Sequence, residues 1–296
     1  GDRIFIRGYD ARNDVYVDGI RDPGVGSRET FAVQQIEVLK GPSSTFGGRG
    51  TTGGAVSLVS KTPGKGDWGD AEFTLGSDAT RRATVDLNEQ VSDTFAVRFN
   101  GMIHESEVAG RDHVYNDRWG AALAAEWQPT RSFKAGFDYY HLSTDFLPDW
   151  GHPYDSANNE PFDVRRDNFY GVLARDEGET FADIYTGRIA WALTDTIQFD
   201  SILRYGQSKN KYTASAPERP DPVARTVSAN AKRRDAITDY WTNQSYFTMD
   251  FVTGGFEHTL VTGIELSREE IVNRQRAFTE CATLPCTGTA ANPRRP

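Results

Sequence analysis

From residue 67 onward, apolar and polar side chains alternate with a period of two. Residues 119–127 are typical, because Trp119, Leu123 and Trp127 fall on one side of the alternation and Glu126 falls on the other. Successive side chains of a β-strand point to opposite faces, so this period indicates strands with one apolar and one polar face. The pattern recurs in about nine segments and predicts a mainly β, antiparallel architecture.

Two architectures share this pattern. A soluble β-sandwich packs the apolar face against a second sheet, whereas a membrane β-barrel turns it toward lipid and keeps the polar face inside. The segments reach the ~10 residues that a strand needs to cross a bilayer at a tilt. Aromatic residues gather near the segment ends, as in the interfacial belts of membrane barrels. They are Trp119, Trp127, Tyr139, Trp191 and Tyr205.

The connections between the segments alternate in length, with long ones near 105–117, 145–181, 209–241 and from 270 onward. Outer-membrane barrels show this asymmetry, with short turns on one side and long loops on the other. The connections therefore favour a transmembrane barrel over a soluble sandwich. An odd number of strands does not close a bacterial barrel, so we expect the chain to be a fragment whose barrel continues downstream.

The N-terminal part contains a glycine-rich stretch, GGRGTTGG, at residues 47–54. Gly48, Gly50 and Gly53 have the G-x-G-x-x-G spacing of dinucleotide-binding folds, in which a helix must open at the last glycine. Here a short β-branched run follows and ends in Thr-Pro-Gly, which predicts a strand and a turn. Without a helix N-terminus no phosphate site forms. We interpret the glycines as structural.

Charge and residue spacing exclude several functions. The chain has 42 acidic and 33 basic residues, a net charge of -9, which argues against nucleic-acid binding. The five histidines show no metal-binding spacing, and no Ser-His-Asp order stands out. We therefore expect no catalytic residues, no metal site of the protein's own and no enzymatic activity.

Three segments of the N-terminal part together carry a family resemblance. IFIRGYD, VYVDGIRD and IEVLKGPSSTFGGRGTTGGAVSLVSKTP, in this order and spacing, resemble the plug domain of TonB-dependent outer-membrane receptors. RETF followed by LKGPSS is most similar to the catecholate-type branch of ferric-siderophore receptors. The resemblance implies that residues 1–66 are the C-terminal part of a plug and that residues 67–296 are the N-terminal part of the transmembrane barrel.

The resemblance also implies a function. It predicts a receptor in the outer membrane of a Gram-negative bacterium that binds ferric siderophore and imports it by TonB-coupled rearrangement of the plug. The expected partners are the ferric siderophore, TonB through a segment outside this sequence, and outer-membrane lipid or lipopolysaccharide, with the receptor a monomer. No cofactor is expected, because the siderophore fills the coordination sphere of iron. The alternatives are a receptor for another solute, such as cobalamin or a glycan, and a non-transporting surface binding barrel.

Ligand-binding candidates lie in two plug loops, 10–14 and 21–28, which the resemblance places toward the outside. Guanidinium groups suit a bulky anion with aromatic faces. The candidates are Arg12, Asn13, Asp14, Arg21, Asp22 and Arg28.

A second group lies in the connection 145–181, whose density of aromatic residues argues against disorder. Such a long loop is either a ligand-facing mouth or packs on itself. The candidates here are Trp150, His152, Tyr154, Arg165 and Arg166. Residues 209–240 carry seven basic and four acidic side chains, which predicts an anion-collecting surface or contacts with lipopolysaccharide phosphates.

Two further pairs have expected roles. Arg7 and Lys40 match family positions that form ion pairs between the plug and carboxylates of the barrel wall. Cys281 and Cys286 enclose four residues, and in an exported chain such a pair indicates a disulfide.

The disulfide gives a first testable prediction. A bridge over four residues constrains little chain, so its loss should cost less than the ~3 kcal/mol expected for a 15-residue loop. We expect the double variant Cys281→Ser, Cys286→Ser to fold normally in the complete receptor. Thiol titration of the native exported protein should find neither cysteine reactive, and two reactive thiols would contradict the pairing.

Overall fold

The computed structural model describes residues 4–11, 14–23, 28–41, 53–156, 158–221, 223–224 and 226–274. Every regular element in these ranges is a β-strand. The described residues contain no helix that is long and apolar enough to span a membrane.

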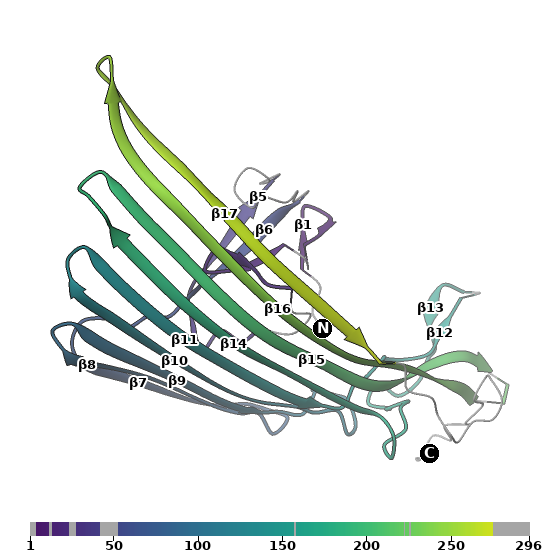
Figure 1. The fold of residues 1–296 in the computed structure, drawn as a ribbon. Helices are drawn as coiled ribbons and strands as arrows, with labels where there is room; N and C mark the ends of the chain where they lie inside the picture. Colours follow the sequence, from purple (N-terminus) through teal and green to yellow (C-terminus); the bar gives the residue numbers. More distant parts are fainter. Residues whose placement is uncertain are drawn as a thin grey trace.

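One curved antiparallel sheet of nine strands dominates the molecule (Figure 1). Each strand pairs with its neighbours in chain order, from β7 at one edge to β17 at the other. The N-terminal residues lie against one face of this sheet (Figure 1). The nine strands are β7 (Trp68–Leu75), β8 (Arg81–Ser92), β9 (Phe95–Glu105), β10 (Asn116–Thr130), β11 (Phe133–Phe146), β14 (Glu177–Ala192), β15 (Ile197–Asp221), β16 (Thr226–Thr253) and β17 (Phe256–Asn273).

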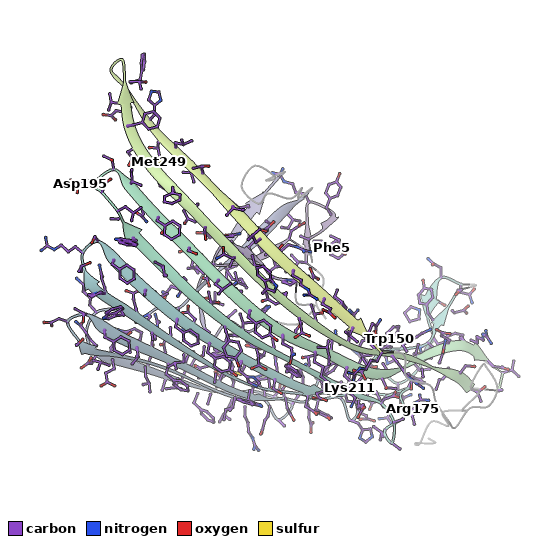
Figure 2. The ribbon with its side chains drawn as sticks, in the orientation of Figure 1. Phe5, Trp150, Arg175, Asp195, Lys211 and Met249 are labelled. Atoms are coloured by element: carbon purple, nitrogen blue, oxygen red, sulfur yellow. The ribbon has the colours of Figure 1, made fainter. Side chains whose placement is uncertain are left out.

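The two ends of the sheet differ in their connections. Tight turns join β8–β9, β10–β11, β14–β15 and β16–β17 at one end, the end marked by Asp195 in Figure 2. The long connections lie at the opposite end, marked by Trp150 and Arg175. One of them contains the small hairpin β12 (Tyr154–Asp155) and β13 (Glu160–Pro161). We call these the short-turn end and the long-loop end.

The outer face of the sheet is apolar and exposed, as the alternation predicts. On β10, Trp119, Leu123 and Trp127 are between 44% and 51% exposed. Trp119 and Trp127 are eight residues apart, which is ~27 Å along the strand at ~3.4 Å per residue; at the ~35–45° tilt of barrel strands this spans roughly 20 Å of the ~25 Å apolar band. Phe133, which packs edge-on against both Trp127 and Trp191 at 6.0 Å, continues one belt onto the next strands. Tyr139 and Tyr185, 4.9 Å apart, are in register with Leu123 between the two tryptophans. The sheet is therefore a segment of a transmembrane barrel wall.

The inner face is polar and largely covered. Its buried side chains include Arg98, Asn100, Thr186 and Arg204. Exposed apolar and buried polar residues are the reverse of a water-soluble domain, and this arrangement suits a wall with lipid outside and a polar interior.

Residues 209–241 are not the loop that the sequence suggested. β15 and β16 stay paired through this range as far as Glu218 opposite Ser228. The strand pattern is difficult to recognise because small side chains replace large ones, as in the buried residues Thr213, Ala214, Ser215 and Ala216. The hairpin thus continues the wall beyond the aromatic belt at the long-loop end.

A smaller sheet forms the centre of the N-terminal domain. Its strand order is β4-β3-β6-β5, with β3 and β6 parallel and the other pairs antiparallel. Ile6, Ala11, Val56 and Leu58 form its buried apolar cluster. The strands of this sheet are β3 (Val15–Val17), β4 (Ile20–Arg21), β5 (Val33–Lys40) and β6 (Gly54–Ser60). A separate short hairpin, β1 (Phe5–Ile6) and β2 (Tyr9–Asp10), precedes them in the chain.

Of the glycine-rich stretch 47–54, the structure describes Gly53 and Gly54. Gly54 has a φ of +141°, and a Cβ atom there would lie 2.0 Å from the carbonyl oxygen of Leu39. The backbones of β5 and β6 approach so closely at this point that no side chain fits. These contacts support the structural interpretation of the glycines.

This close approach predicts a specific defect. Gly54→Ala should strain the backbone and separate β5 from β6, destabilising the N-terminal domain by more than about 1 kcal/mol. Limited proteolysis of the complete receptor should then cut within residues 33–60. Gly64→Ala is the matched control, because a Cβ atom at Gly64 meets only Trp68 Nε1, at 3.8 Å. Equal resistance of both variants would contradict the prediction.

Candidate functional site

A buried arginine of the wall holds the N-terminal domain. Arg204 on β15 is 2% exposed, and its Nη1 donates to the carbonyl oxygen of Val17 at 2.7 Å. Its Nη2 donates to Asp18 at 3.0 Å, and its Nε donates to Thr186 at 2.9 Å. Each guanidinium nitrogen therefore has an acceptor, as a buried charge requires.

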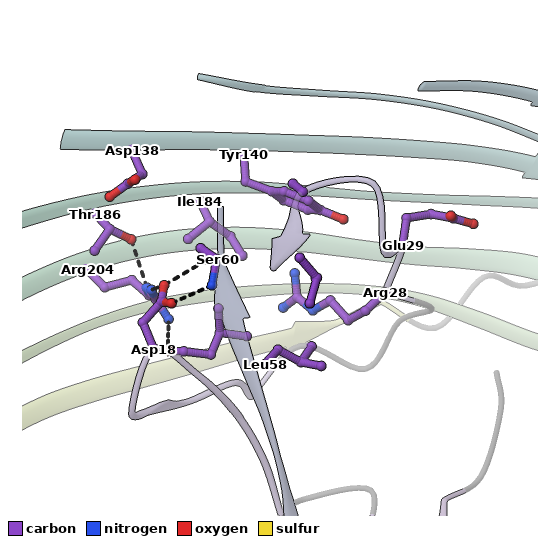
Figure 3. A pocket seen from close by; sticks show the side chains of 13 residues that line it. Asp18, Arg28, Glu29, Leu58, Ser60, Asp138, Tyr140, Ile184, Thr186 and Arg204 are labelled. Carbon is purple, nitrogen blue, oxygen red and sulfur yellow. Dashed lines mark hydrogen bonds and ion pairs between the residues drawn. The ribbon is translucent and has the colours of Figure 1, made fainter. Parts of the chain in front are cut away.

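Asp18 collects several of these contacts, as Figure 3 shows. It lies in the turn between β3 and β4 with a φ of +51°, a conformation that Asp tolerates better than most residues. Besides Arg204, its carboxylate accepts bonds from the amide and the hydroxyl of Ser60, both at 2.8 Å. Arg188 on β14 lies 3.6 Å away. One carboxylate thus joins two strands of the domain to two strands of the wall.

Glu29 makes an equivalent contact with the other side of the wall. Its carboxylate forms ion pairs with Arg82 on β8, at 2.9 Å, and with Arg118 on β10. Phe31, two residues further on, stacks on Tyr140 of β11 with ring centroids 5.6 Å apart. The domain is therefore held by charge and by aromatic packing.

A third contact lies where the N-terminal domain joins the first wall strands. Lys61 forms an ion pair with Asp86 at 2.8 Å and donates to Asn100 at 3.2 Å. Arg98 binds the same Asp86 through two bonds of 2.8 Å and donates to the carbonyl oxygen of Thr62 at 2.9 Å. The Arg98 guanidinium also lies 4.7 Å from the ring centre of Trp68. This network fixes the exit of the domain to β8 and β9.

Of the plug candidates, Asp22 and Arg28 lie together in the interface. They form an ion pair with each other, and Asp22 is 5% exposed. The Arg28 guanidinium lies 5.9 Å from the ring centre of Tyr140. Burial by itself would lower the pKa of Arg28, but the carboxylate of Asp22 outweighs burial and the pKa is raised. Arg28 therefore carries a permanent charge inside the interface.

The other plug candidates are more peripheral. Arg21 lies 3.8 Å from Glu269 on β17. Asp14 is partly covered, and burial raises its pKa in spite of the nearby Arg21. Arg12 and Asn13 lie outside the described residues.

Arg7 and Lys40 are exposed, and within the described ranges neither forms an ion pair. Their pairing with wall carboxylates stays a prediction.

The sequence contains a different signal, in the wall strands, for the ion pairs that do form. Each of the wall arginines falls on the polar side of its strand's alternation, where a charged side chain needs a partner; they are Arg82, Arg98, Arg118, Arg188 and Arg204.

A cavity of about 50 Å³ lies between the domain and the wall (Figure 3). Asp18, Ser60 and Arg204 line it together with Tyr140 and Ile184. At roughly 10–15 Å³ per molecule it has room for a few waters. No cluster of His, Cys, Asp or Glu with the arrangement of a metal site occurs in the described part of the chain.

The candidates of the long connection lie together at the long-loop end, and Arg111 organises this loop. Arg111 donates to both oxygens of Asp149, at 2.6 and 3.0 Å, and to the carbonyl oxygen of Arg166 at 2.7 Å. His152 contacts Arg111 and packs edge-on against Tyr170, so it belongs to the loop's own packing.

The remaining candidates of this loop face solvent. Trp150 is 50% exposed, and Tyr154 is 47% exposed while donating to Asn159 at 2.8 Å. Arg165 pairs with Asp167, whose hydrogen bond raises the pKa of the guanidinium. Arg166 is exposed. The loop therefore combines a packed interior with a solvent-facing aromatic and cationic surface.

The basic side chains expected to collect anions at residues 209–240 are partly neutralised. Lys209 pairs with Glu179 at 3.0 Å, and Lys211 pairs with Glu177 at 2.7 Å. Lys232 pairs with Glu218 at 2.8 Å. The cysteines Cys281 and Cys286 lie outside the described residues.

These features define a class of protein. A wall with an apolar outer face, whose polar inner face is bound by an N-terminal domain through buried ion pairs, is part of a plugged membrane β-barrel.

Comparisons with known proteins give the family. Residues 1–55 match the model of the TonB-dependent Receptor Plug Domain. The chain is 34% identical over 294 residues to the catecholate siderophore receptor Fiu of Escherichia coli O6:H1, an alignment that covers 92% of this chain and 39% of Fiu. The chain belongs to the TonB-dependent receptors, and it spans about two fifths of the length of the curated relatives it matches.

Solved structures agree. The open form of the ferric-catecholate import receptor Fiu from E. coli K12 has a TM-score of 0.85 at 33% identity, over 92% of this chain and 44% of Fiu. The siderophore receptor PiuA from Acinetobacter baumannii has the same TM-score at 32% identity, over 92% of this chain and 40% of PiuA. The ferripyoverdine receptor of Pseudomonas aeruginosa, at 19% identity, shares the fold. The chain is thus part of a Gram-negative outer-membrane receptor, and these relatives are named as receptors rather than enzymes.

The buried pair of Asp18 and Arg204 gives the prediction of this section. Asp18→Asn keeps a residue that tolerates positive φ but leaves Arg204 without its anion, and breaking a buried pair in this way costs about 3–5 kcal/mol. Hydrogen–deuterium exchange in the complete receptor should therefore speed up across residues 15–21 and 54–60.

Asp78→Asn is the control, because Asp78 also lies in a turn with a φ of +56° but forms no ion pair within the described residues. The double variant Asp18→Asn, Arg204→Met should recover part of the protection, since it removes both charges. Additive effects of the two single changes would show that the pair does not hold the domain.

Proposed function

We propose that this chain is part of a receptor that binds a ferric siderophore at the cell surface and imports it by TonB-coupled rearrangement of the plug. Residues 1–66 serve as the C-terminal part of the plug and residues 67–296 as the N-terminal part of the barrel. The observation that carries the proposal is the plug–wall interface, in which Asp18 and Glu29 bind wall arginines. Ion pairs, unlike a dry apolar core, can exchange their partners for water when the plug moves.

The ligand class follows from the relatives and from the loop surface. Fiu is named a catecholate siderophore receptor, and the long-loop end of this chain presents Trp150, Arg165 and Arg166 to solvent. Arginine and aromatic rings suit an anionic chelate with aryl faces. The siderophore brings its own iron ligands, so the protein needs no cofactor.

The receptor's partners follow from the same proposal. TonB couples to the plug through a segment outside this sequence, and the apolar outer face contacts lipid and lipopolysaccharide. The receptor works as a monomer and binds no nucleic acid, in keeping with the acidic net charge of the chain.

Binding and uptake by the complete receptor test this proposal. We expect it to bind ferric tris-catecholate chelates without energy and to import them only while the inner membrane is energised. Binding without any uptake would favour a surface adhesin. Binding of cobalamin or a glycan in place of every ferric chelate would favour a receptor for another solute.

The loop surface gives a second, sharper prediction. Arg165→Gln with Arg166→Gln should weaken chelate binding by about tenfold, because a charge-assisted contact contributes ~1.5–3 kcal/mol. Trp150→Ala should weaken it to a similar extent, because it removes a large aromatic face on which an aryl group stacks. The effect of the arginine changes should fade as salt rises. Arg131→Gln with Lys65→Gln removes the same charge near the short-turn end and should leave affinity unchanged. Equal affinities in all variants would place the capture site elsewhere.

A further inference from the structure

Most basic side chains on the inner face of the wall form an ion pair with a carboxylate. Arg204, for example, binds Asp18, and Arg118 binds Glu29. Within the described residues, every lysine and arginine on the inner face of the nine strands has a carboxylate within 4.0 Å except Arg234 on β16. The paired residues are Arg82, Arg98, Arg118, Lys134, Arg188, Arg204 and Lys232.

Arg234 is not simply a solvated surface residue. Its side chain is half-buried, and its Nε atom is buried with no hydrogen-bond partner in the described structure. A buried donor without an acceptor costs free energy. An unpaired guanidinium with an unsatisfied donor is therefore ready to accept an anion.

The register of the strands places two aromatic side chains beside Arg234. Tyr212 on β15 is directly opposite Arg234, Gly178 on β14 is opposite Tyr212, and Phe146 on β11 is opposite Gly178. Paired residues share a face of the sheet with their Cβ atoms ~4.5–5.5 Å apart. Phe146, Tyr212 and Arg234 thus form one row across four neighbouring strands, which we call the upper row.

Gly178 shapes this row. A Cβ atom at Gly178 would lie 2.5–2.7 Å from three carbon atoms of the Phe146 ring. The ring therefore lies on the backbone of β14, where any side chain would displace it. This fixes an aromatic face beside Tyr212 and the guanidinium.

The upper row lies above the plug contact, toward the long-loop end. Arg234 precedes Tyr240 by six residues on β16, which is ~20 Å along the strand at ~3.4 Å per residue. Tyr240 is at the level of Arg28 and Tyr140 in the plug–wall interface. The two rows between carry mostly small side chains, among them Ala182, Ser208, Thr180, Ala236 and Thr238. A ligand that has passed the loops therefore meets the upper row before the plug.

We infer that Phe146, Tyr212 and Arg234 form a wall site for an anionic aryl chelate of iron. The inference rests on the proposed siderophore function and names the chemistry that this part of the wall selects. The guanidinium pairs with the negative oxygens of the chelate, and its planar fork suits them better than an ammonium does. The rings of Phe146 and Tyr212 offer faces on which the aryl groups stack. A neutral chelate without aryl rings gains neither contact.

Two hexadentate iron chelates of the same size class test the site in the complete receptor. One is a tris-catecholate with net charge −3, and the other is a neutral tris-hydroxamate. Equilibrium binding without energised uptake is measured for wild type, Arg234→Gln, Arg234→Lys and Tyr212→Leu. Arg233→Gln is the matched control, since it removes the same charge one residue away, on the opposite face of β16.

We expect Arg234→Gln to weaken binding of the tris-catecholate by tenfold or more, the loss typical of one charge-assisted contact. Binding of the tris-hydroxamate should change by less than about twofold, and Arg233→Gln should affect neither chelate. Arg234→Lys should be intermediate, because it keeps the charge but loses the planar fork. Tyr212→Leu should also weaken the catecholate alone, because it keeps bulk but removes the stacking face.

Three outcomes would overturn the inference. Unchanged tris-catecholate affinity in Arg234→Gln removes the site, while the proposed function stands as long as wild type binds that chelate. Equal losses in Arg234→Gln and Arg233→Gln would indicate a general disturbance of the hairpin. Failure of folded wild-type receptor to bind either chelate would overturn the proposed function and the inference with it.

Discussion

The structure depends on the partnering of charged side chains that face away from lipid. A wall whose outer face is apolar must place its arginines inside, where an uncompensated charge is costly. The N-terminal domain supplies the anions for three of them, with Asp18 bound to Arg204 and Glu29 bound to Arg82 and Arg118, while wall carboxylates pair with Arg98 and Arg188. Wall and domain are therefore complementary in charge. Separating them would leave charged side chains of both without their partners.

The three groups of contacts divide the domain into parts held in different ways. Asp18 and Glu29 contact the wall through single carboxylates, each shared between two strands. Lys61 and Arg98, by contrast, belong to a network of ion pairs, an amide and a backbone carbonyl at the point where the chain enters β7. Removing Asp18 or Glu29 takes ion pairs from two wall strands at once, whereas loss of Asp86 would still leave Lys61 bonded to Asn100 and Arg98 bonded to the carbonyl oxygen of Thr62.

The sequence predicts most of the large sheet because strand periodicity is a local property. Alternation locates strands such as β10 and β11, and the positions of Trp119 and Trp127 give the width of the apolar band. The prediction fails at residues 209–241, where alanine, serine and threonine weaken the contrast between faces without interrupting the pairing.

The candidate site is less predictable because its contacts join distant residues. Asp18 and Arg204 are 186 residues apart, and only the packing of two domains brings them together. The same holds for Asp22 and Arg28, which the sequence places in a ligand-facing loop and the structure places against Tyr140. By contrast, the candidates around Trp150 lie near one another because they belong to one stretch of chain, and their role in ligand binding stays a prediction.

The uninterrupted pairing of β15 and β16 beyond the membrane has a consequence for how such a receptor diversifies. Because side chains alternate between faces, inserting or deleting one residue within either strand exchanges the inner and outer residues on one side of the change. A change in β15 before Tyr212 would turn Tyr212 outward with the residues beyond it, and a change in β16 between Arg234 and the membrane would do the same to Arg234. Insertions and deletions in this hairpin should therefore be tolerated when they add or remove two residues, which preserves the alternation, or when they fall at its tip. The loop that carries β12 and β13 has no such parity, so lineages are free to vary its length one residue at a time.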